Sequence, residues 1–247
     1  MNKIKKTEPT PVTTQIWSEN ADIFMRVRHT SQERVLHPYL ADRIMDLNPD
    51  QMLDFGCGDT RLLDLVPKEI TVDAYDKNPE MLEIAKVKNG TRIRTFMEDW
   101  RDIPRGVYDV GLLSMVLMTI SDPIEHQQIL RSLKDSLRDE GKALIAITHP
   151  CFRDRIFSNV ITSFHGEQPY QYLKEGQPFT VRIEDQAPPS VAFVDFHWTL
   201  SFTINEIVKA GLEITRFDEL GDDAEGSGYN PDAPLFIVIT TQKKETR

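Results

Sequence analysis

The 247-residue sequence has few cysteines and no long run of hydrophobic residues. Its two cysteines, Cys57 and Cys151, are too few for the disulfide framework of a small secreted protein. No stretch of about 18 apolar residues is present that could span a bilayer, and we find no secretory signal. We therefore expect a cytoplasmic protein without a membrane partner.

The chain also has few basic residues relative to acidic ones. It contains 29 Lys and Arg against 39 Asp and Glu, which gives a formal net charge of −10. Proteins that bind nucleic acid usually present a broad basic face, so we expect no nucleic-acid partner. No cluster of Cys, His and carboxylate residues has the spacing of metal ligands, so no metal is predicted. The sequence leaves open whether the protein is a monomer or a homodimer.

The chain shows no internal repeat and reads as one large domain. The Thr- and Pro-rich residues 1–14 are predicted to be a disordered tail, and residues 15–247 a single domain. Apolar residues at helical spacing predict helices within 15–47. From residue 51 onward, strand and helix patterns alternate, which predicts an α/β fold with helices on both faces of a parallel sheet.

Helix starts and late strands are marked by short patterns. Asn78-Pro79 and Asp122-Pro123 each supply a capping residue followed by proline at the first helical position. Thr203 and Glu206 form the pattern of a capping box, which predicts a helix starting there. Two further strands are expected around residues 213–219 and 235–241.

Residues 53–60 combine an apolar strand, a Gly-x-Gly turn and acidic residues. Gly56 and Gly58 let the backbone approach a ligand without a Cβ atom in the way. Asp54 lies at the end of this strand, and Asp76 ends the next apolar run, 22 residues later. An acid at the second position can bind both hydroxyls of a ribose. The pattern therefore predicts a nucleoside cofactor.

The residues after the glycines separate two cofactor classes. A dinucleotide site has a third Gly or Ala, where this chain has the large and charged Arg61. Asp59 is a poor neighbour for a pyrophosphate, but it suits a ligand that carries an ammonium and a sulfonium. S-adenosylmethionine (SAM) is therefore favoured over NAD, with S-adenosylhomocysteine as the product.

Five segments in this order resemble the class I SAM-dependent methyltransferases, and the resemblance extends over residues 15–242. They are residues 53–60, 72–82, 96–100, 108–114 and 141–148. The resemblance implies a Rossmann-like, seven-stranded, mostly parallel sheet, an N-terminal helical cover and an insert after strand five. Thr60 departs from the pattern, because many members have glycine there.

The resemblance also implies which residues hold the cofactor. Asp54 would lie near the methionine amine, and Asp59 either shares that task or is simply stabilised near a helix N-terminus. Asp99 and Trp100 would flank the adenine. The full set of predicted cofactor-binding residues is Asp54, Gly56, Cys57, Gly58, Asp59, Asp76, Lys77, Asp99, Trp100, Ser114 and Met115.

Residues 149–198 form the predicted insert and hold nine aromatic residues. We predict that they form a lid over a small, mostly apolar substrate. The alternatives are that the rings form the insert's own core or contact a second subunit. The predicted substrate-contacting residues are Trp17, Phe152, Phe196 and Asp195.

Two histidines in the insert are candidate general bases. His149 directly follows strand five and is expected to point into the cleft, within a His-Pro-Cys-Phe run that resembles a subset of small-molecule methyltransferases. Strand alternation places His197 on the same face as Asp195, which could orient it. Either histidine could take a proton from a hydroxyl. The alternative is that both are structural, because methyl transfer often needs only alignment.

The run after strand four further restricts the substrate. Residues 114–117 read Ser-Met-Val-Leu, whereas enzymes that methylate bases or amides commonly have Asn/Asp-Pro-Pro-Tyr/Phe there. The predicted function is methyl transfer from SAM to an oxygen or nitrogen of a small, largely apolar or aromatic metabolite, in a biosynthetic pathway. The alternatives are a carrier-bound or peptide substrate, and a non-catalytic SAM-binding regulator.

Overall fold

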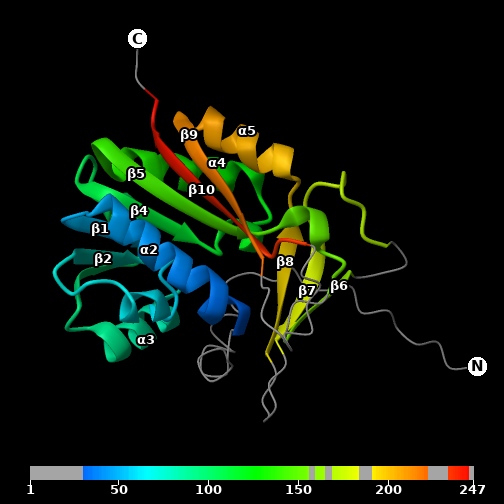
Figure 1. The fold of residues 1–247 in the computed structure, drawn as a ribbon, viewed down its shortest axis with the longest axis horizontal. Helices are drawn as coiled ribbons and strands as arrows, with labels where there is room; N and C mark the ends of the chain where they lie inside the picture. The colour runs from blue at the N-terminus through cyan, green and yellow to red at the C-terminus, as the bar shows by residue number, and fades with distance from the viewer. Residues whose placement is uncertain (1–29, 156–158, 165–168, 184–190, 222–232, 245–247) are drawn as a thin grey trace, which may run out of the picture.

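A seven-stranded sheet forms the centre of the molecule, with helices on both faces (Figure 1). The computed structural model describes residues 30–155, 159–164, 169–183, 191–221 and 233–244. Strand β10 runs antiparallel to both of its neighbours, and the other neighbouring strands are parallel. This arrangement confirms the predicted α/β class. In spatial order the strands are β3 (Ile93–Met97), β2 (Thr71–Tyr75), β1 (Gln51–Phe55), β4 (Tyr108–Ser114), β5 (Leu137–Thr148), β10 (Phe236–Lys243) and β9 (Leu212–Leu220).

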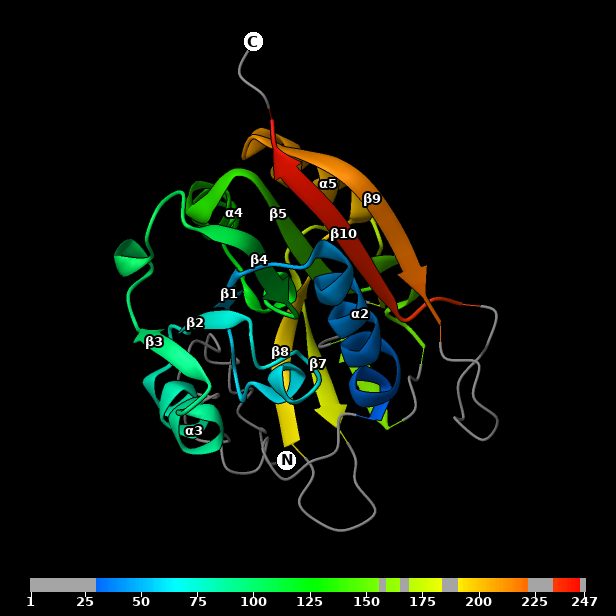
Figure 2. The same cartoon turned by 60° about the vertical axis from the view of Figure 1, so that its left-hand side comes forward.

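Two hydrophobic cores lie on the two faces of this sheet. Helices α2 (His37–Leu47) and α3 (Pro79–Asn89) cover one face, and α4 (Pro123–Ser136) and α5 (Leu200–Lys209) cover the other (Figure 2). Successive strand residues alternate between the cores: Met52 packs in the first and Leu53 in the second. Both faces of the central strands are therefore buried, as in other parallel sheets.

The predicted helix starts are confirmed at α3 and α4 but not at α5. Asn78 accepts hydrogen bonds from the first turn of α3, and Asp122 does so for α4. Helix α5 begins at Leu200, with Thr199 as its N-cap, so the predicted start at Thr203 is wrong. Thr199 Oγ1 accepts from the Phe202 amide at 3.0 Å, which leaves Thr203 inside the first turn.

The insert folds into a separate antiparallel sheet. Its strands are β6 (Val160–Phe164), β7 (Gln177–Ile183) and β8 (Val191–His197), in that spatial order. Figures 1 and 2 both place this sheet beyond one end of the main sheet, where β4 and β5 end. The Trp198 indole N–H donates to the Ile120 carbonyl at 2.9 Å, which connects the two sheets.

The N-terminal cover is described from residue 30 onward. A short helical turn, η1 (Gln32–Leu36), runs directly into α2, and Pro38 lies in the first turn of that helix. The predicted helix before it, including Trp17, lies outside the described residues.

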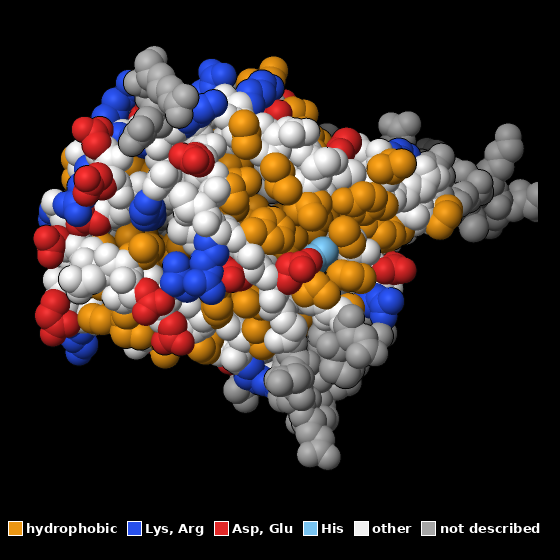
Figure 3. Space-filling model, turned by 45° about the horizontal axis from the view of Figure 1, so that its top comes forward, with side chains coloured by type: hydrophobic (Ala, Val, Ile, Leu, Met, Phe, Trp, Pro, Cys, Tyr) orange, Lys and Arg blue, Asp and Glu red, His pale blue; other side chains and the backbone are white. Residues whose placement is uncertain are grey.

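The surface combines charged regions with an apolar band. Figure 3 shows hydrophobic side chains gathered across the middle of one face and extending towards the side where the insert lies. Charged side chains lie mainly around this band. Within the described ranges, no helix has both the length and the hydropathy needed to cross a membrane.

Candidate active site

A cavity of about 480 Å³ extends from the glycine turn after β1 to the insert sheet. Residues at the carboxyl ends of β1, β2 and β4 line one end, and side chains of β7 and β8 line the other. Ligands of open α/β sheets bind at this edge. The cavity thus lies where the sequence predicted the site.

The backbone of the glycine turn adopts a left-handed conformation that is unfavourable for residues with a side chain. Gly56 and Gly58 have φ angles of +78° and +52°. A Cβ atom on Gly56 would also collide with the side chain of Val116. The Gly56 and Cys57 amides both donate to the Tyr75 carbonyl, at 2.7 and 3.0 Å. These bonds fix the end of β1 against the end of β2.

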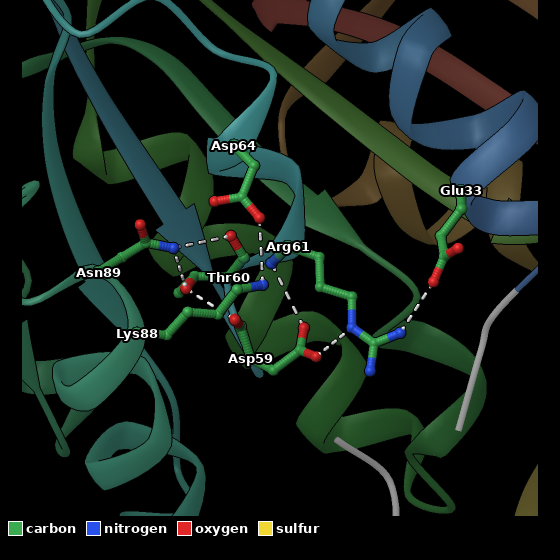
Figure 4. Close-up of polar contacts among 7 residues, drawn as sticks. All are labelled: Glu33, Asp59, Thr60, Arg61, Asp64, Lys88 and Asn89. Atoms are coloured by element: carbon green, nitrogen blue, oxygen red, sulfur yellow. Dashed lines mark hydrogen bonds and ion pairs between the residues drawn. The ribbon is translucent and has the colours of Figure 1, made fainter. Parts of the chain in front are cut away.

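Two other cavity-lining residues also have left-handed backbones. Thr60 has φ +58° and Met115 has φ +60°, a conformation that is rare outside glycine and that clusters at functional sites. The Asn89 side chain donates to Thr60 Oγ1 at 2.9 Å (Figure 4). The left-handed backbone at Thr60 explains why glycine would be suited to this position.

Three carboxyl groups surround the turn. Burial, together with the neighbouring Asp76 and Asp59, raises the pKa of Asp54 to about 7. Burial also raises the pKa of Asp76, although its oxygens accept from the Gly58 and Asn78 amides, both at 2.9 Å. This concentration of acid groups favours a cationic ligand.

One of the three carboxyl groups is already paired with a cation. The Arg61 guanidinium lies between Asp59 and Glu33, donating to Asp59 Oδ2 through Nε and to Glu33 through Nη1 at 3.1 Å (Figure 4). Asp54 makes no side-chain hydrogen bond to any other described residue. Asp54 is thus better placed than Asp59 to receive an ammonium group.

The predicted adenine end is partly assembled. Trp100 lines the cavity and is 43% exposed, so its ring is available to a ligand. Asp99 is not part of the described lining, and its carboxylate accepts from the Arg101 amide and guanidinium. Lys77 lines the cavity and donates to Glu125 at 2.9 Å. The other predicted residues in the lining are Asp54, Gly56, Cys57, Gly58, Asp59, Asp76, Ser114 and Met115.

The two candidate bases lie outside the cavity wall as the described residues define it. His149 was expected to point into the cleft, but its Nδ1 accepts from the Cys151 amide at 3.2 Å and its Nε2 donates to Glu219 at 2.7 Å. Burial lowers the pKa of His149, and Glu219 opposes that effect. Both ring nitrogens are thus already engaged.

The expected pairing of His197 with Asp195 is not formed. His197 is fully buried, and its Nε2 donates to the Tyr172 carbonyl at 2.7 Å. Within the described part of the chain, its Nδ1 and Asp195 Oδ1 both lack a hydrogen-bond partner. Strand alternation put both residues on one face, as predicted, but alternation does not set side-chain direction closely enough to make a bond.

The aromatic residues of the insert fall into two groups, one in the cavity wall and one that packs within the insert. Phe179 and Phe193 line the cavity, as the lid hypothesis requires. Phe164 and Tyr170 stack on each other with ring centres 4.7 Å apart, so other rings pack against each other within the insert. The predicted substrate residues Phe152 and Phe196 are not among the described lining residues, whereas Asp195 is.

Sequence reasoning missed several residues of the cavity wall. Phe179, Val181 and Ile183 alternate along β7, a period-2 pattern that could have identified this wall. Arg153 lines the cavity immediately after the turn η5 (Pro150–Phe152). A single arginine in an insert has no distinguishing spacing, so only the folded chain reveals it.

A family model described as a methyltransferase domain matches residues 28–172, more than half of the chain. The chain belongs to this family. No curated protein matches the chain.

Solved structures of low sequence identity share the fold. The CcbJ methyltransferase from Streptomyces caelestis has a TM-score of 0.66 and 14% identity, covering 92% of this chain and 96% of its own. A SAM-dependent methyltransferase structure from Listeria monocytogenes has a TM-score of 0.59 and 20% identity, covering 85% and 98%. The SAM-bound CalS10 from Micromonospora echinaspora has a TM-score of 0.57 and 17% identity, covering 95% and 99%. The chain therefore has the fold of SAM-dependent methyltransferases, with SAM as the cofactor that this fold and family support.

Proposed function

We propose that the protein transfers the methyl group of SAM to an oxygen or nitrogen of a small, largely apolar metabolite. The observation that carries this proposal is the continuous cavity, which joins an acidic glycine turn to the apolar wall of the insert. Enclosed, mostly apolar sites with few polar groups suit small molecules. The similar structure CalS10 is described as an amino pentose methyltransferase in calicheamicin biosynthesis, which agrees with a small acceptor and a biosynthetic role.

The residues at the glycine turn fit the cofactor chemically. Each oxygen of Asp76 accepts one backbone amide and keeps a lone pair for a ribose hydroxyl. Asp54 would accept from the ammonium group, and the exposed face of Trp100 would stack on the adenine. When bound, SAM supplies an electrophilic methyl group, and the chain aligns the acceptor and excludes water.

The roles proposed for the histidines as general bases remain predictions. In the described geometry, His149 donates a hydrogen bond to Glu219, and His197 donates one to the Tyr172 carbonyl. Alignment of the acceptor is therefore the simpler source of rate acceleration.

The first test is calorimetric titration with SAM and then with S-adenosylhomocysteine. We expect Asp76→Ala to abolish measurable binding, and Asp76→Asn to weaken it by about tenfold or more, because charged hydrogen bonds are worth about 1.5–3 kcal/mol. Asp46→Asn is the matched control, since Asp46 is paired with Arg43 on the surface of α2.

Circular dichroism of each variant shows whether it keeps the fold. Wild-type affinity in a folded Asp76→Asn protein would refute the cofactor assignment. With SAM binding established, a screen of phenolic, carboxylate and amine metabolites tests for turnover.

Two alternatives make different predictions in the same screen. A carrier-bound or peptide substrate would give turnover only with the macromolecule. A non-catalytic regulator would bind SAM but methylate no acceptor. We also propose a cytoplasmic location and a monomer or homodimer, and light scattering distinguishes between the two assembly states.

A further inference from the structure

The insert end of the cavity contains two buried groups of opposite charge. Asp195 on β8 and Arg153 after η5 each line the cavity, and each is only 4% exposed. The walls around them are apolar, including Phe179, Val181 and Phe193. An acid and a guanidinium in such surroundings are expensive to bury without partners.

The hydrogen-bonding capacity of the two groups is not exhausted. Arg153 donates to Thr148 Oγ1 through Nη1, and its guanidinium lies 5.0 Å from the centre of the Phe179 ring. Its Nε has no hydrogen-bond partner among the described residues, and neither has Asp195 Oδ1. No ion pair joins the two side chains within the described ranges, although each affects the other electrostatically. One donor and one acceptor thus remain unused beside the same cavity.

We propose, building on the proposed function, that Asp195 and Arg153 together bind a hydroxyl group of the methyl acceptor, which is therefore a small apolar phenol or alcohol. A hydroxyl donates one hydrogen bond and accepts others, so it can donate to Asp195 and accept from Arg153. A carboxylate could accept hydrogen bonds from Arg153, but the negative charge of Asp195 would repel it. An ammonium group could donate hydrogen bonds to Asp195, but the positive charge of Arg153 would repel it.

The charge states of the pair are compatible with this role. Burial raises the pKa of Asp195 to about 7, and Arg153 opposes that effect. Burial lowers the pKa of Arg153 to about 10, and Asp195 opposes that effect. At pH 8 the carboxyl group is therefore mostly ionised and accepts a hydrogen bond, while the guanidinium stays charged and donates.

The test uses four probes of equal alkyl chain at pH 8, with saturating S-adenosylhomocysteine. They are 4-propylphenol, 4-propylanisole, 4-propylbenzoate and 4-propylbenzylamine, titrated by calorimetry. We expect the phenol to bind at least about tenfold more tightly than its methyl ether, because the ether cannot donate to a charged carboxylate. We also expect it to bind more tightly than the acid and the amine.

Variants locate the preference on the two side chains. Asp195→Leu and Arg153→Met should each reduce the preference for the phenol over the ether to within about twofold. The neighbouring Asp154→Leu and Arg155→Met are the controls, because neither residue is among the described lining of the cavity, and they should retain the wild-type preference.

The wild-type comparison alone can overturn the proposal, even if a variant fails to fold. Tightest binding of the benzoate would identify an acid site, and tightest binding of the benzylamine an amine site. Equal binding of all four probes would mean that the pair recognises no polar group. Because S-adenosylhomocysteine binding is measured first, failure of the cofactor assignment is distinguished from failure of the hydroxyl assignment.

Discussion

Asp54 is a buried carboxyl group whose ionisation is unfavourable in the unliganded fold. It is 5% exposed, and its pKa is raised from 3.8 to about 7. Between these two values the folded chain binds more protons at this site than the unfolded chain does. Stability from this group is therefore present at low pH and is lost as the pH rises from about 4 to about 7.

We expect Asp54→Asn to raise the free energy of unfolding of the unliganded protein at pH 8, by about 2–4 kcal/mol. At pH 4.5 the Asp54 carboxyl of the folded wild type is protonated, so the substitution should raise the free energy of unfolding much less. Urea unfolding at the two pH values measures both differences. An equal gain at both values would show that the charge is not responsible.

Among single residues, those with local backbone or spacing signals were predictable. Asp54, Gly56 and Gly58 are identified by the turn, and Asp76 by its distance along the chain. Arg153 was not predictable, because its position depends on how the insert folds back over the sheet. The partners of Asp59 and Asp99 were also missed, because arginines two residues along the chain reach back to each carboxylate.

At the scale of elements, Thr199 joins the insert to α5. Its hydroxyl accepts from the Phe202 amide and donates to Glu175 at 2.5 Å, while its own amide donates to the other Glu175 oxygen at 3.0 Å. One side chain therefore caps the helix and holds the loop before β7.

We expect Thr199→Ala to lower the free energy of unfolding by about 1–2 kcal/mol, the usual value of an N-cap. Thr199→Ser keeps the hydroxyl and should stay close to the wild type. Urea unfolding of the three proteins measures the difference. Equal stability of the Ala and Ser variants would show that the cap contributes nothing.

Elements with strong periodic patterns and local caps were predicted well. Strands β1 to β5, helices α3 and α4, and the late strands β9 and β10 follow the sequence pattern. The helix expected after the glycine turn is only a short 3-10 turn, Arg61–Asp64. The insert was predicted as an aromatic lid and not as a sheet, although β7 and β8 have seven residues each and Phe179, Val181 and Ile183 alternate along β7. The start of α5 was placed late, because Thr203 and Glu206 also fit the pattern of a capping box, whereas the helix is capped by Thr199.

At the scale of the whole molecule, the two sheets meet around Trp198. This side chain is 6% exposed and stacks on Phe202 with ring centres 4.3 Å apart. Its indole also donates to the Ile120 carbonyl. Because the junction is buried and hydrogen-bonded, we expect the two sheets to unfold together.

The wild type should therefore show a single calorimetric transition that coincides with the loss of far-UV circular dichroism. Trp198→Ala should lower the free energy of unfolding by about 3–5 kcal/mol, as for other buried tryptophans. Trp198→Phe keeps an aromatic ring and should lower the free energy of unfolding by less. Two separate transitions in the wild type would contradict this coupling.

Within the described residues, the strands of the insert sheet pair with one another and not with strands of the main sheet. Substitutions on β7 and β8 can therefore alter one wall of the cavity without shifting the register of β1, β2 or β4. A chain built this way can acquire a new acceptor by a few changes in one module while keeping its methyl donor. Substrate specificity in this architecture can therefore diverge through a small number of successive substitutions.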